Sequence, residues 1–257
     1  CFFRKQYTSW FCCFLNEPLP SLKMGRRKYL GSRPTTSTTN DQSKFMKNMF
    51  SGITVRLSES HQDKQAVHEL RINAYAKYEW SNNGKRMGFD ATDENPWVDS
   101  LIAFQKNEPI GTMRIIRANR DTIDRLLSYE LWKDHIDQCI SNSSPNILEF
   151  NRFAITEGGN FPIAACALLK AAMAIQAIDN IDFITGEVRA DHAGFYQKFL
   201  GMAVSEEVRT DRILQVDYSL LTGYPKSGIG KLQQRKPWMV PTRADIDSWK
   251  QVASISW

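Results

Sequence analysis

The feature that most constrains the fold of this chain is the order in which strand-like and helix-like apolar patterns follow one another. From residue 53 onward the sequence gives strand, helix, two strands, helix, strand, helix, strand, helix and two final strands. No segment of it is an internal repeat. This order predicts an α/β (α+β) arrangement, in which helices cover a mixed sheet.

The individual elements are set by apolar residues that recur every second position in strands and every third or fourth in helices. Ser60 followed by Asp63 resembles a capping box and predicts the start of the first helix. A hairpin turn is predicted at Asn107, Glu108 and Pro109. The predicted strands cover residues 53–57, 101–105, 110–117, 147–155, 182–188, 203–208 and 213–221, and the helices cover residues 60–78, 123–139, 162–179 and 193–199.

Composition predicts one domain, at residues 45–225, with an extension on each side. Residues 32–43 are nearly all Ser, Thr, Asn, Asp and Gln, and such a segment has too little apolar surface to offset the entropy of ordering. We therefore expect residues 1–44 to be disordered or, since Met24 is a candidate start, partly non-native. The tail at residues 226–257 carries three tryptophans and is expected to pack back on the domain.

Charge and cysteine usage exclude several classes of protein. No apolar run approaches the roughly 20 residues that span a bilayer, so we expect no integral membrane segment. No zinc-finger spacing or nucleic-acid motif is present, so nucleic acid is not expected as a partner. The five cysteines are odd in number and form no C-x-x-C, which favours a reducing, cytoplasmic location and no metal site.

Basic residues cluster in two places in a chain whose formal net charge is +5. One cluster is residues 26–28, and the other is Lys231, Arg235 and Lys236. Such clusters are either solvated surface or a docking surface for an acidic partner.

Several charged residues fall inside apolar patterns. Arg71 lies in the apolar stripe of the first predicted helix, where an unpaired guanidinium would cost several kcal/mol. Asp90 and Asp93 in the following loop are the expected partners. Arg114, Glu149 and Arg152 lie on predicted strands, and a bulge would bring the last two to one side of the sheet. These residues form either a structural ion-pair network or a functional site.

The hexapeptide Glu-Phe-Asn-Arg-Phe-Ala at residues 149–154 resembles the E-x-x-R-F-[AG] strand of acyl-homoserine-lactone (autoinducer) synthases and long-chain N-acyl amino acid synthases. The resemblance extends over residues 53–220. It implies an acceptor site made of Arg71, Tyr75, Trp80, Asp90, Asp93 and Arg114. Gly88 stands where the lactone synthases usually carry a Glu, which favours the N-acyl amino acid synthases.

Residues 194–202 are similar to the F-Y-x-K-L-G-F helix of the wider GCN5-related N-acyltransferase (GNAT) superfamily. That resemblance implies a GNAT-like mixed, splayed central β-sheet flanked by helices. It also implies that Tyr196 protonates the departing thiolate, although Tyr196 could instead only pack against the donor or the core.

The loop after the strand that holds Glu149 is where this superfamily binds the acyl donor. Gly158 and Gly159 match its adjacent glycines, but the basic residue is missing and Glu157 would repel a pyrophosphate. We therefore expect no bound cofactor and an acyl thioester as donor substrate, either acyl-CoA or, favoured by Glu157, an acyl carrier protein (ACP) thioester. An acidic carrier protein would also give the basic clusters a partner.

The expected chemistry needs a base, because an amine must be neutral to attack a thioester. Glu149 could accept the proton directly or through water, and Arg152 completes the predicted catalytic set with Tyr196. The backbone around Phe153, Ala154 and Ile155 could bind the donor and stabilise the oxyanion if the strand splays there.

The sequence therefore predicts an N-acyltransferase that moves an acyl group, favoured as long-chain, from a thioester to the α-amine of an amino acid or a related small-molecule amine. The alternatives are an acyl-homoserine-lactone synthase that uses S-adenosylmethionine, an ordinary acetyl-CoA-dependent N-acetyltransferase, and a non-catalytic domain of this fold that binds an acyl ligand.

Overall fold

A computed structural model describes residues 50, 52–76, 91–141, 143–156, 161–211 and 216–253. These residues form an eight-stranded sheet in the order β1-β2-β3-β4-β5-β8-β6, with β7 also paired to β8. The strands are β1 (Ile53–Leu57), β2 (Val98–Gln105), β3 (Glu108–Ala118), β4 (Ile147–Ile155), β5 (Phe183–Arg189), β6 (Ala203–Val204), β7 (Arg209–Thr210) and β8 (Asp217–Gly223). The α-helices are α3 (His61–Tyr75), α5 (Leu127–Ile140), α6 (Phe161–Ile178), α7 (Ala193–Leu200), α8 (Pro225–Arg235) and α9 (Arg243–Ala253), and the short 3-10 helices are η2 (Ala91–Glu94), η3 (Arg120–Arg125), η4 (Ala190–His192) and η5 (Pro237–Met239).

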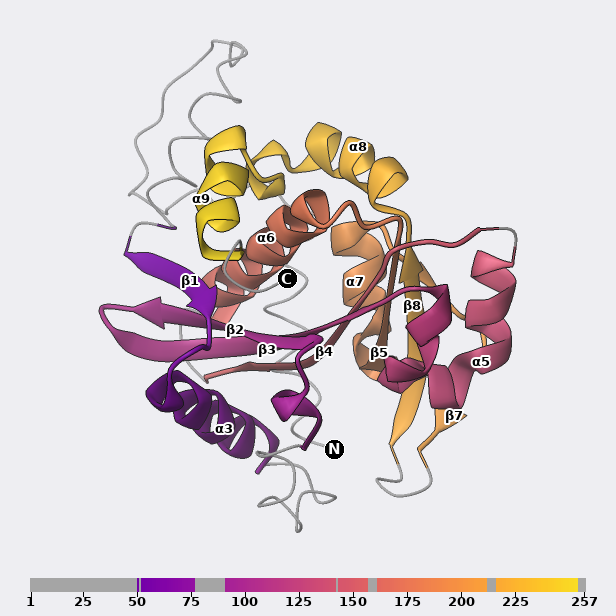
Figure 1. The fold of residues 1–257 in the computed structure, drawn as a ribbon, viewed down its shortest axis with the longest axis horizontal. Helices are drawn as coiled ribbons and strands as arrows, with labels where there is room; N and C mark the ends of the chain where they lie inside the picture. Colours follow the sequence, from indigo (N-terminus) through magenta and orange to yellow (C-terminus); the bar gives the residue numbers. More distant parts are fainter. Residues whose placement is uncertain are drawn as a thin grey trace, which may run out of the picture.

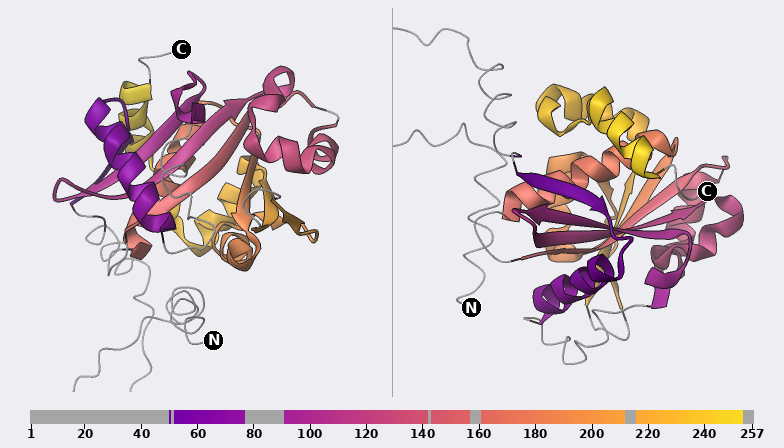
Figure 2. Two further views of the ribbon diagram at one scale, coloured as in Figure 1. Left: turned by 90° about the horizontal axis from the view of Figure 1, so that it is seen from below. Right: turned by 60° about the vertical axis from the view of Figure 1, so that its left-hand side comes forward.

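Helices cover both faces of the sheet, as the predicted mixed, splayed fold requires. Figure 1 shows α6, α8 and α9 over one face and α3 on the opposite face. In the same view α5 lies at the right, on the side of the molecule away from β1. The right-hand view of Figure 2 shows the sheet edge-on between these two layers. Three apolar clusters fill the interior of the described residues: one under α6, one between the sheet and α5, and a small one between α3 and β2.

The first half of the fold follows the predicted pattern closely. Ser60 caps α3, because its hydroxyl accepts a hydrogen bond from the Asp63 backbone N–H at 3.0 Å. The carboxylate of Asp63 pairs with Arg56 at 2.7 Å instead of completing a capping box. The hairpin turn lies one to two residues earlier than predicted, at Lys106 and Asn107, whose positive φ angles of 51° and 68° allow a tight two-residue connection.

The second half shows three differences from the predicted elements. The helix predicted at residues 123–139 is divided into η3 and α5. The first arm of the predicted final hairpin, at residues 203–208, is divided into the short strands β6 and β7, and both pair antiparallel with β8. β8 begins at Asp217 and not at Ile213, which lies outside the described residues.

The last helices pack against the rest of the fold. Leu232 of α8 and Met239 of η5 are buried in the cluster under α6. Lys170 of α6 pairs with Asp245 of α9 at 2.9 Å, which satisfies the one cation of this otherwise apolar helix. Figure 1 shows α8 and α9 lying over α6.

Three sets of predictions fall outside the described residues: the extension at residues 1–44, the loop that holds Trp80, Gly88 and Asp90, and the glycine-bearing loop at residues 157–160. Within the described residues, no helix is both long enough and apolar enough to cross a bilayer.

Candidate active site

The centre of the sheet contains a fork, the point at which β4 and β5 part. These two strands are the only parallel pair among the described strands, and they pair only through Ile147, Leu148 and Glu149, with Glu149 opposite Thr185. Beyond this point β4 pairs with β3 alone and β5 with β8 alone. Figure 1 shows β5 and β8 running steeply across the direction of β2 and β3. Past Glu149, β4 therefore has no described partner strand on the side where β5 lies.

At the point where β4 and β5 part, a glycine lets the two backbones lie very close together. An added Cβ on Gly186 of β5 would lie 2.7 Å from the carbonyl oxygen of Phe150 on β4, closer than real side chains come. The fork therefore depends on the missing side chain of Gly186, which the sequence analysis did not single out.

Arg71, as predicted, is buried and paired with Asp93. The guanidinium is fully buried, its Nη1 lies 2.5 Å from Asp93, and its Nη2 donates to the Ser100 hydroxyl at 3.0 Å. Burial lowers the pKa of Arg71, and the charge of Asp93 opposes that effect. Asp93 also lies 3.5 Å from Nη1 of Arg114, so one carboxylate joins a helix to the centre of the sheet.

Arg114 continues this network toward the fork. Its Nε donates to Asn151 Oδ1 at 2.6 Å, and Asn151 Nδ2 donates in turn to Glu149 Oε1. These partners fix the orientation of the amide, with its oxygen toward the arginine and its nitrogen toward the glutamate. A continuous chain of polar contacts thus runs from α3 through Asp93, Arg114 and Asn151 to Glu149.

Glu149 is completely buried where this chain ends, at the beginning of α5. Its Oε2 accepts hydrogen bonds from the Ser128 backbone N–H at 2.9 Å and from the Ser128 hydroxyl at 2.6 Å. Burial raises the pKa of Glu149, while these hydrogen bonds, the Asn151 amide and the charge of Arg114 favour the ionised form. Both carboxylate oxygens are therefore engaged by protein donors.

Arg152 occupies a bulge, as the sequence analysis anticipated between Glu149 and Arg152. The β3–β4 register shifts between the Thr112 pair and the Arg114 pair, and Arg152 has a φ of 50°. The bulge restores Ala154 to the position opposite Thr112 while Phe153 packs on the cluster under α6. The positive charge of the Arg152 guanidinium acts on Tyr218 of β8 and lowers the pKa of that phenol.

Three tyrosines gather beyond the fork from three different elements. Tyr75 ends α3, Tyr196 lies on α7 and Tyr218 lies on β8. Burial raises the pKa of Tyr196 above its usual value, and Tyr75 adds to that shift. Burial raises the pKa of Tyr218 to about 12, with contributions from Glu187 and from Tyr75.

Glu187 is a second carboxyl beside the fork, and it is partly buried. It lies on β5 two residues after Thr185, so it shares the face of the sheet toward which Glu149 points. Burial, followed by the negative charge of Glu149, raises the pKa of Glu187 to about 8. A carboxyl with that pKa exchanges a proton near neutral pH.

The structure thus brings together Arg71, Asp93, Arg114 and Glu149 in one network, and places Tyr75, Arg152, Tyr196 and the strand segment 153–155 around the fork. Trp80, Asp90, Gly158 and Gly159 lie outside the described residues. Sequence reasoning missed Ser100, Ser128, Asn151 and Glu187. Asn151 and Ser128 are neutral residues that carry no signal by themselves, but Glu187 is a charge inside the strand predicted at residues 182–188 and could have been noticed.

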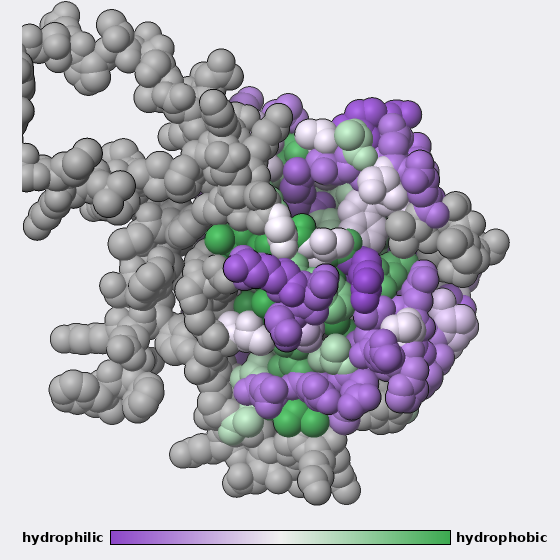
Figure 3. All heavy atoms as spheres, turned by 90° about the vertical axis from the view of Figure 1, so that its left-hand side faces the viewer, coloured by the Kyte–Doolittle hydropathy of each residue, from purple (hydrophilic) through white to green (hydrophobic). Residues whose placement is uncertain are grey.

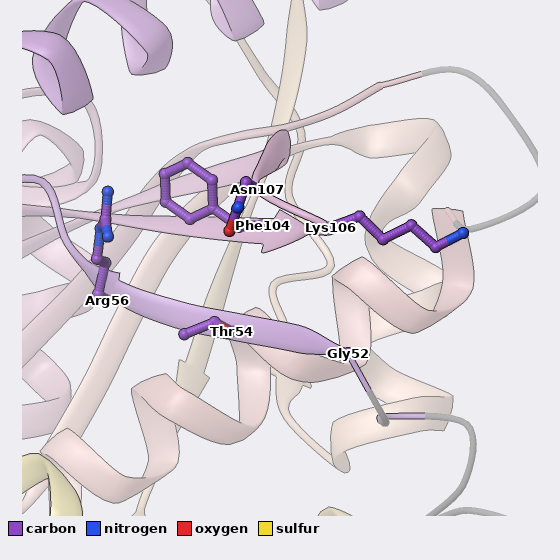
Figure 4. A pocket seen from close by; sticks show the side chains of 6 residues that line it. All are labelled: Gly52, Thr54, Arg56, Phe104, Lys106 and Asn107. Carbon is purple, nitrogen blue, oxygen red and sulfur yellow. The ribbon is translucent and has the colours of Figure 1, made fainter.

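A hollow of about 400 Å³ lies elsewhere, at the β1 edge of the sheet, and is lined by Gly52, Thr54, Arg56, Phe104, Lys106 and Asn107 (Figure 4). The exposed Arg56 in its lining stacks 4.4 Å from the centre of the Phe104 ring and pairs with Asp63. Figure 3 shows the same side of the molecule, where hydrophilic and apolar residues alternate. None of the network residues lines this hollow.

Asp134, His135 and Glu207 are the one described group whose ligand atoms come close enough for a metal ion. Arg209 already occupies it, donating to Asp134 at 2.9 Å and to Glu207 at 2.8 Å while stacking on Trp132. The arginine supplies the positive charge that a metal would bring, so this cluster does not fit a metal ion.

Comparison with known proteins gives a consistent result. The profile of a family described as "N-acyl amino acid synthase FeeM" matches residues 66–222. The solved structure of FeeM, an N-acyl amino acid synthase from uncultured soil microbes, is similar to this fold with a TM-score of 0.57 and 14% identity, covering 69% of this chain and 93% of that one. The structure of the acyl-homoserine-lactone (AHL) synthase LasI has a TM-score of 0.49 and 15% identity, and the match covers 67% of this chain and 90% of that one. The structure of an acyl-CoA N-acyltransferase from Pseudomonas aeruginosa has a TM-score of 0.45 and 10% identity, and the match covers 66% of this chain and 97% of that one. No curated protein matches.

Proposed function

The chain belongs to the FeeM family of N-acyl amino acid synthases, and from this premise we propose that it transfers a long-chain acyl group from a thioester to the α-amine of an amino acid. That it is an N-acyltransferase of the GNAT fold follows from the family and the fold. The observation that carries the finer proposal is the buried network that joins Arg71 to Glu149 through Asp93, Arg114 and Asn151.

The network supports an acceptor that has both an ammonium and a carboxylate group. Two buried guanidinium groups, those of Arg71 and Arg114, share Asp93, and guanidinium is the group that binds carboxylates in a bidentate manner. Glu149 supplies negative charge at the other end of the network, where an ammonium group would be held. An α-amino acid carries these two groups on one carbon and matches this division of charge.

The reaction would take place at the fork. Backbone N–H groups of β4 around Ala154 and Ile155 have no partner strand on the β5 side, so they can stabilise the tetrahedral oxyanion. Tyr196 is partly buried on α7 and its pKa is raised, so its hydroxyl stays protonated and able to donate to the departing thiolate.

Glu149 is the residue that the sequence analysis favoured as the base, and it lies on the same strand as Arg152. Since both of its oxygens accept hydrogen bonds from Ser128 and Asn151, it would gain a proton only through a neighbouring group. Glu149→Gln should therefore slow the reaction by roughly 100-fold or more while the affinity for the donor is retained.

We propose an acyl-ACP donor and no bound cofactor. Lys231 and Arg235 are exposed on α8 and could meet an acidic carrier protein. Lys236 is not available for this role, because it is half-buried and its ammonium lies 4.7 Å from the centre of the Phe199 ring. The described cysteines, Cys139 and Cys166, are both free thiols, which supports a reducing, cytoplasmic location.

The proposal is tested by mass spectrometry of lipid extracts from a heterologous host that expresses the chain. The expected products are N-acyl amino acids that are absent when Glu149→Gln is expressed at the same level. Detection of acyl-homoserine lactones or only of N-acetylated amines would replace the proposed function by one of those alternatives.

A further inference from the structure

Glu187 is a partly buried carboxyl on β5, and one of its two oxygens has no hydrogen-bond donor. Its Oε1 atom is shielded from solvent and accepts no hydrogen bond from any described residue. Glu149, by contrast, is held by three hydrogen bonds from Ser128 and Asn151. A shielded carboxyl oxygen without a donor is costly, because hydrogen bonds normally compensate burial, and this cost points to a function.

Its position is set by the sheet and not by a loop. Glu187 is the second residue of β5 past the Glu149–Thr185 pair, and it lies opposite Leu220 of β8. Gly186, just before it, touches the backbone of β4 where the strands part. The carboxyl therefore stands at the mouth of the fork, on the face that carries Glu149 and the acceptor network.

The charged and titratable groups around Glu187 come from every element that packs on it. Glu149 lies on β4, Asp211 follows β7, Glu130 lies on α5 and Tyr218 lies on β8. The three acids all disfavour a negative charge on Glu187, whereas the indole N–H of Trp132 on α5 favours it. This cluster keeps the carboxyl ready to hold a proton, and it repels anions while attracting an ammonium group.

We propose that Glu187 accepts the proton of the acceptor ammonium, and that Glu149 acts through it as a positioning residue. The inference rests on the proposed function. Glu149 would hold Asn151 and Arg114 in place and, as a fixed negative charge, make Glu187 more basic. Glu187 is thereby the catalytic residue and Glu149 is the group that tunes it.

The proton balance of the reaction is complete with these groups. Glu187 takes one proton from the ammonium, and the neutral amine forms a bond to the thioester carbon. When the tetrahedral intermediate collapses, the C–S bond breaks and the thiolate takes a proton from Tyr196. The second proton leaving the nitrogen replaces the one that Tyr196 gave, and Glu187 returns its proton to solvent, so one proton is released for each amide formed.

The test compares pH–rate profiles of wild type, Glu187→Gln and Glu149→Gln, with acyl-ACP as donor and an amino acid that the wild type acylates. The acid limb of the kcat/KM profile should be lost in Glu187→Gln, with a rate at pH 7 reduced by about 100-fold or more. In Glu149→Gln the acid limb should remain but move to lower pH, because the charge that makes Glu187 more basic is gone. Glu130→Gln removes an exposed acid from the same surroundings and serves as the matched control, with a near-normal profile.

The opposite pattern would overturn the inference: loss of the acid limb in Glu149→Gln, with only a shift in Glu187→Gln, would make Glu149 the base. If Glu187→Gln melts at a lower temperature and cannot be assayed, the Glu149→Gln profile alone decides, since a retained, shifted limb supports Glu187 and a lost limb contradicts it. Failure of the wild type to acylate any amine would contradict the proposed function instead, so the two failures are distinguishable.

Discussion

At the scale of single residues, Arg71 is the side chain on which the acceptor site most depends. It is fully buried, and Asp93 is 19% exposed, so removing the guanidinium leaves a largely desolvated carboxylate without its main partner. We expect Arg71→Met to lower the free energy of unfolding by about 3 kcal/mol. Urea denaturation monitored by circular dichroism gives this value.

Arg243→Met is the matched control for that measurement. Arg243 of α9 pairs with Asp247 at 3.1 Å, and the two side chains are 81% and 48% exposed. Solvent screening makes such pairs weak, and the expected loss is under about 1 kcal/mol. Equal losses for the two variants would mean that Arg71 is not the buried anchor described here.

Glu187 also makes a prediction about stability. The pKa of this carboxyl is raised from its usual value of 4.5 to about 8 in the folded protein. Between these values the folded state binds a proton that the unfolded state has released. Stability from this group is therefore full below pH 4.5 and falls as the pH rises to about 8, with a slope of at most ~1.4 kcal/mol per pH unit.

Glu187→Gln cannot release a proton, so the free energy of unfolding of the wild type should fall relative to this variant between pH 5 and pH 8. Denaturation curves at several pH values measure the difference. Parallel stability curves over this interval would show that Glu187 has an ordinary pKa and would weaken its role in proton transfer.

Part of the site could be predicted from sequence because a charge inside an apolar pattern is conspicuous. Arg71, Arg114 and Glu149 interrupt such patterns, and the structure places them in one buried network. Asn151 and Ser128 connect or anchor this network, yet small neutral polar residues are common in strands and helix starts. Their roles depend on contacts between distant segments, which no local pattern reveals.

At the scale of elements, the fork between β4 and β5 depends on Gly186. Gly186→Ala would place a Cβ 2.7 Å from the Phe150 carbonyl oxygen, so one of the strands must shift. Overpacking of this kind typically costs about 1–3 kcal/mol. We expect a lower melting temperature together with a fall in kcat/KM, because β4 carries the proposed oxyanion N–H groups.

Gly194→Ala on α7 is the matched control, since an added Cβ there meets no atom within 4 Å. That variant should be as stable as the wild type or slightly more so, because alanine favours a helix. Normal activity and stability in Gly186→Ala would contradict the close approach of β4 and β5.

The bounds of the long strands could be predicted from their apolar residues, whereas the bounds of short strands that depend on pairing with another strand could not. β1 and β4 have the bounds that apolar alternation indicated. β6 and β7 are short pieces set by pairing with the long strand β8, and residues 205–208 between them are mostly polar. Local pattern cannot show where pairing with a distant strand begins or ends.

At the scale of the whole molecule, the exposed cations of α8 lead to a prediction about the donor. Lys231→Glu combined with Arg235→Glu reverses two charges on a helix that covers the outside of the fold. If an acidic carrier protein docks there, kcat/KM for acyl-ACP should fall by tenfold or more, and kcat/KM for acyl-CoA should change little. The loss should shrink at high salt, which screens such contacts.

The control for the donor experiment is Arg243→Glu combined with Lys250→Glu on α9, which removes equal charge from the neighbouring helix. A carrier protein that binds at α8 should tolerate it. Equal use of acyl-ACP and acyl-CoA by the wild type at low salt would contradict the proposed donor, although not the acyl transfer itself.

The central claim is that this chain joins an acyl group to the α-amine of an amino acid. The most direct measurement incubates the purified protein with a long-chain acyl-ACP and an equimolar mixture of the natural amino acids, and identifies the products by mass spectrometry. We predict release of one free carrier thiol for each amide formed, with one or a few N-acyl amino acids as products. Thioester hydrolysis alone, or no consumption of the donor above the rate without protein, would contradict the account.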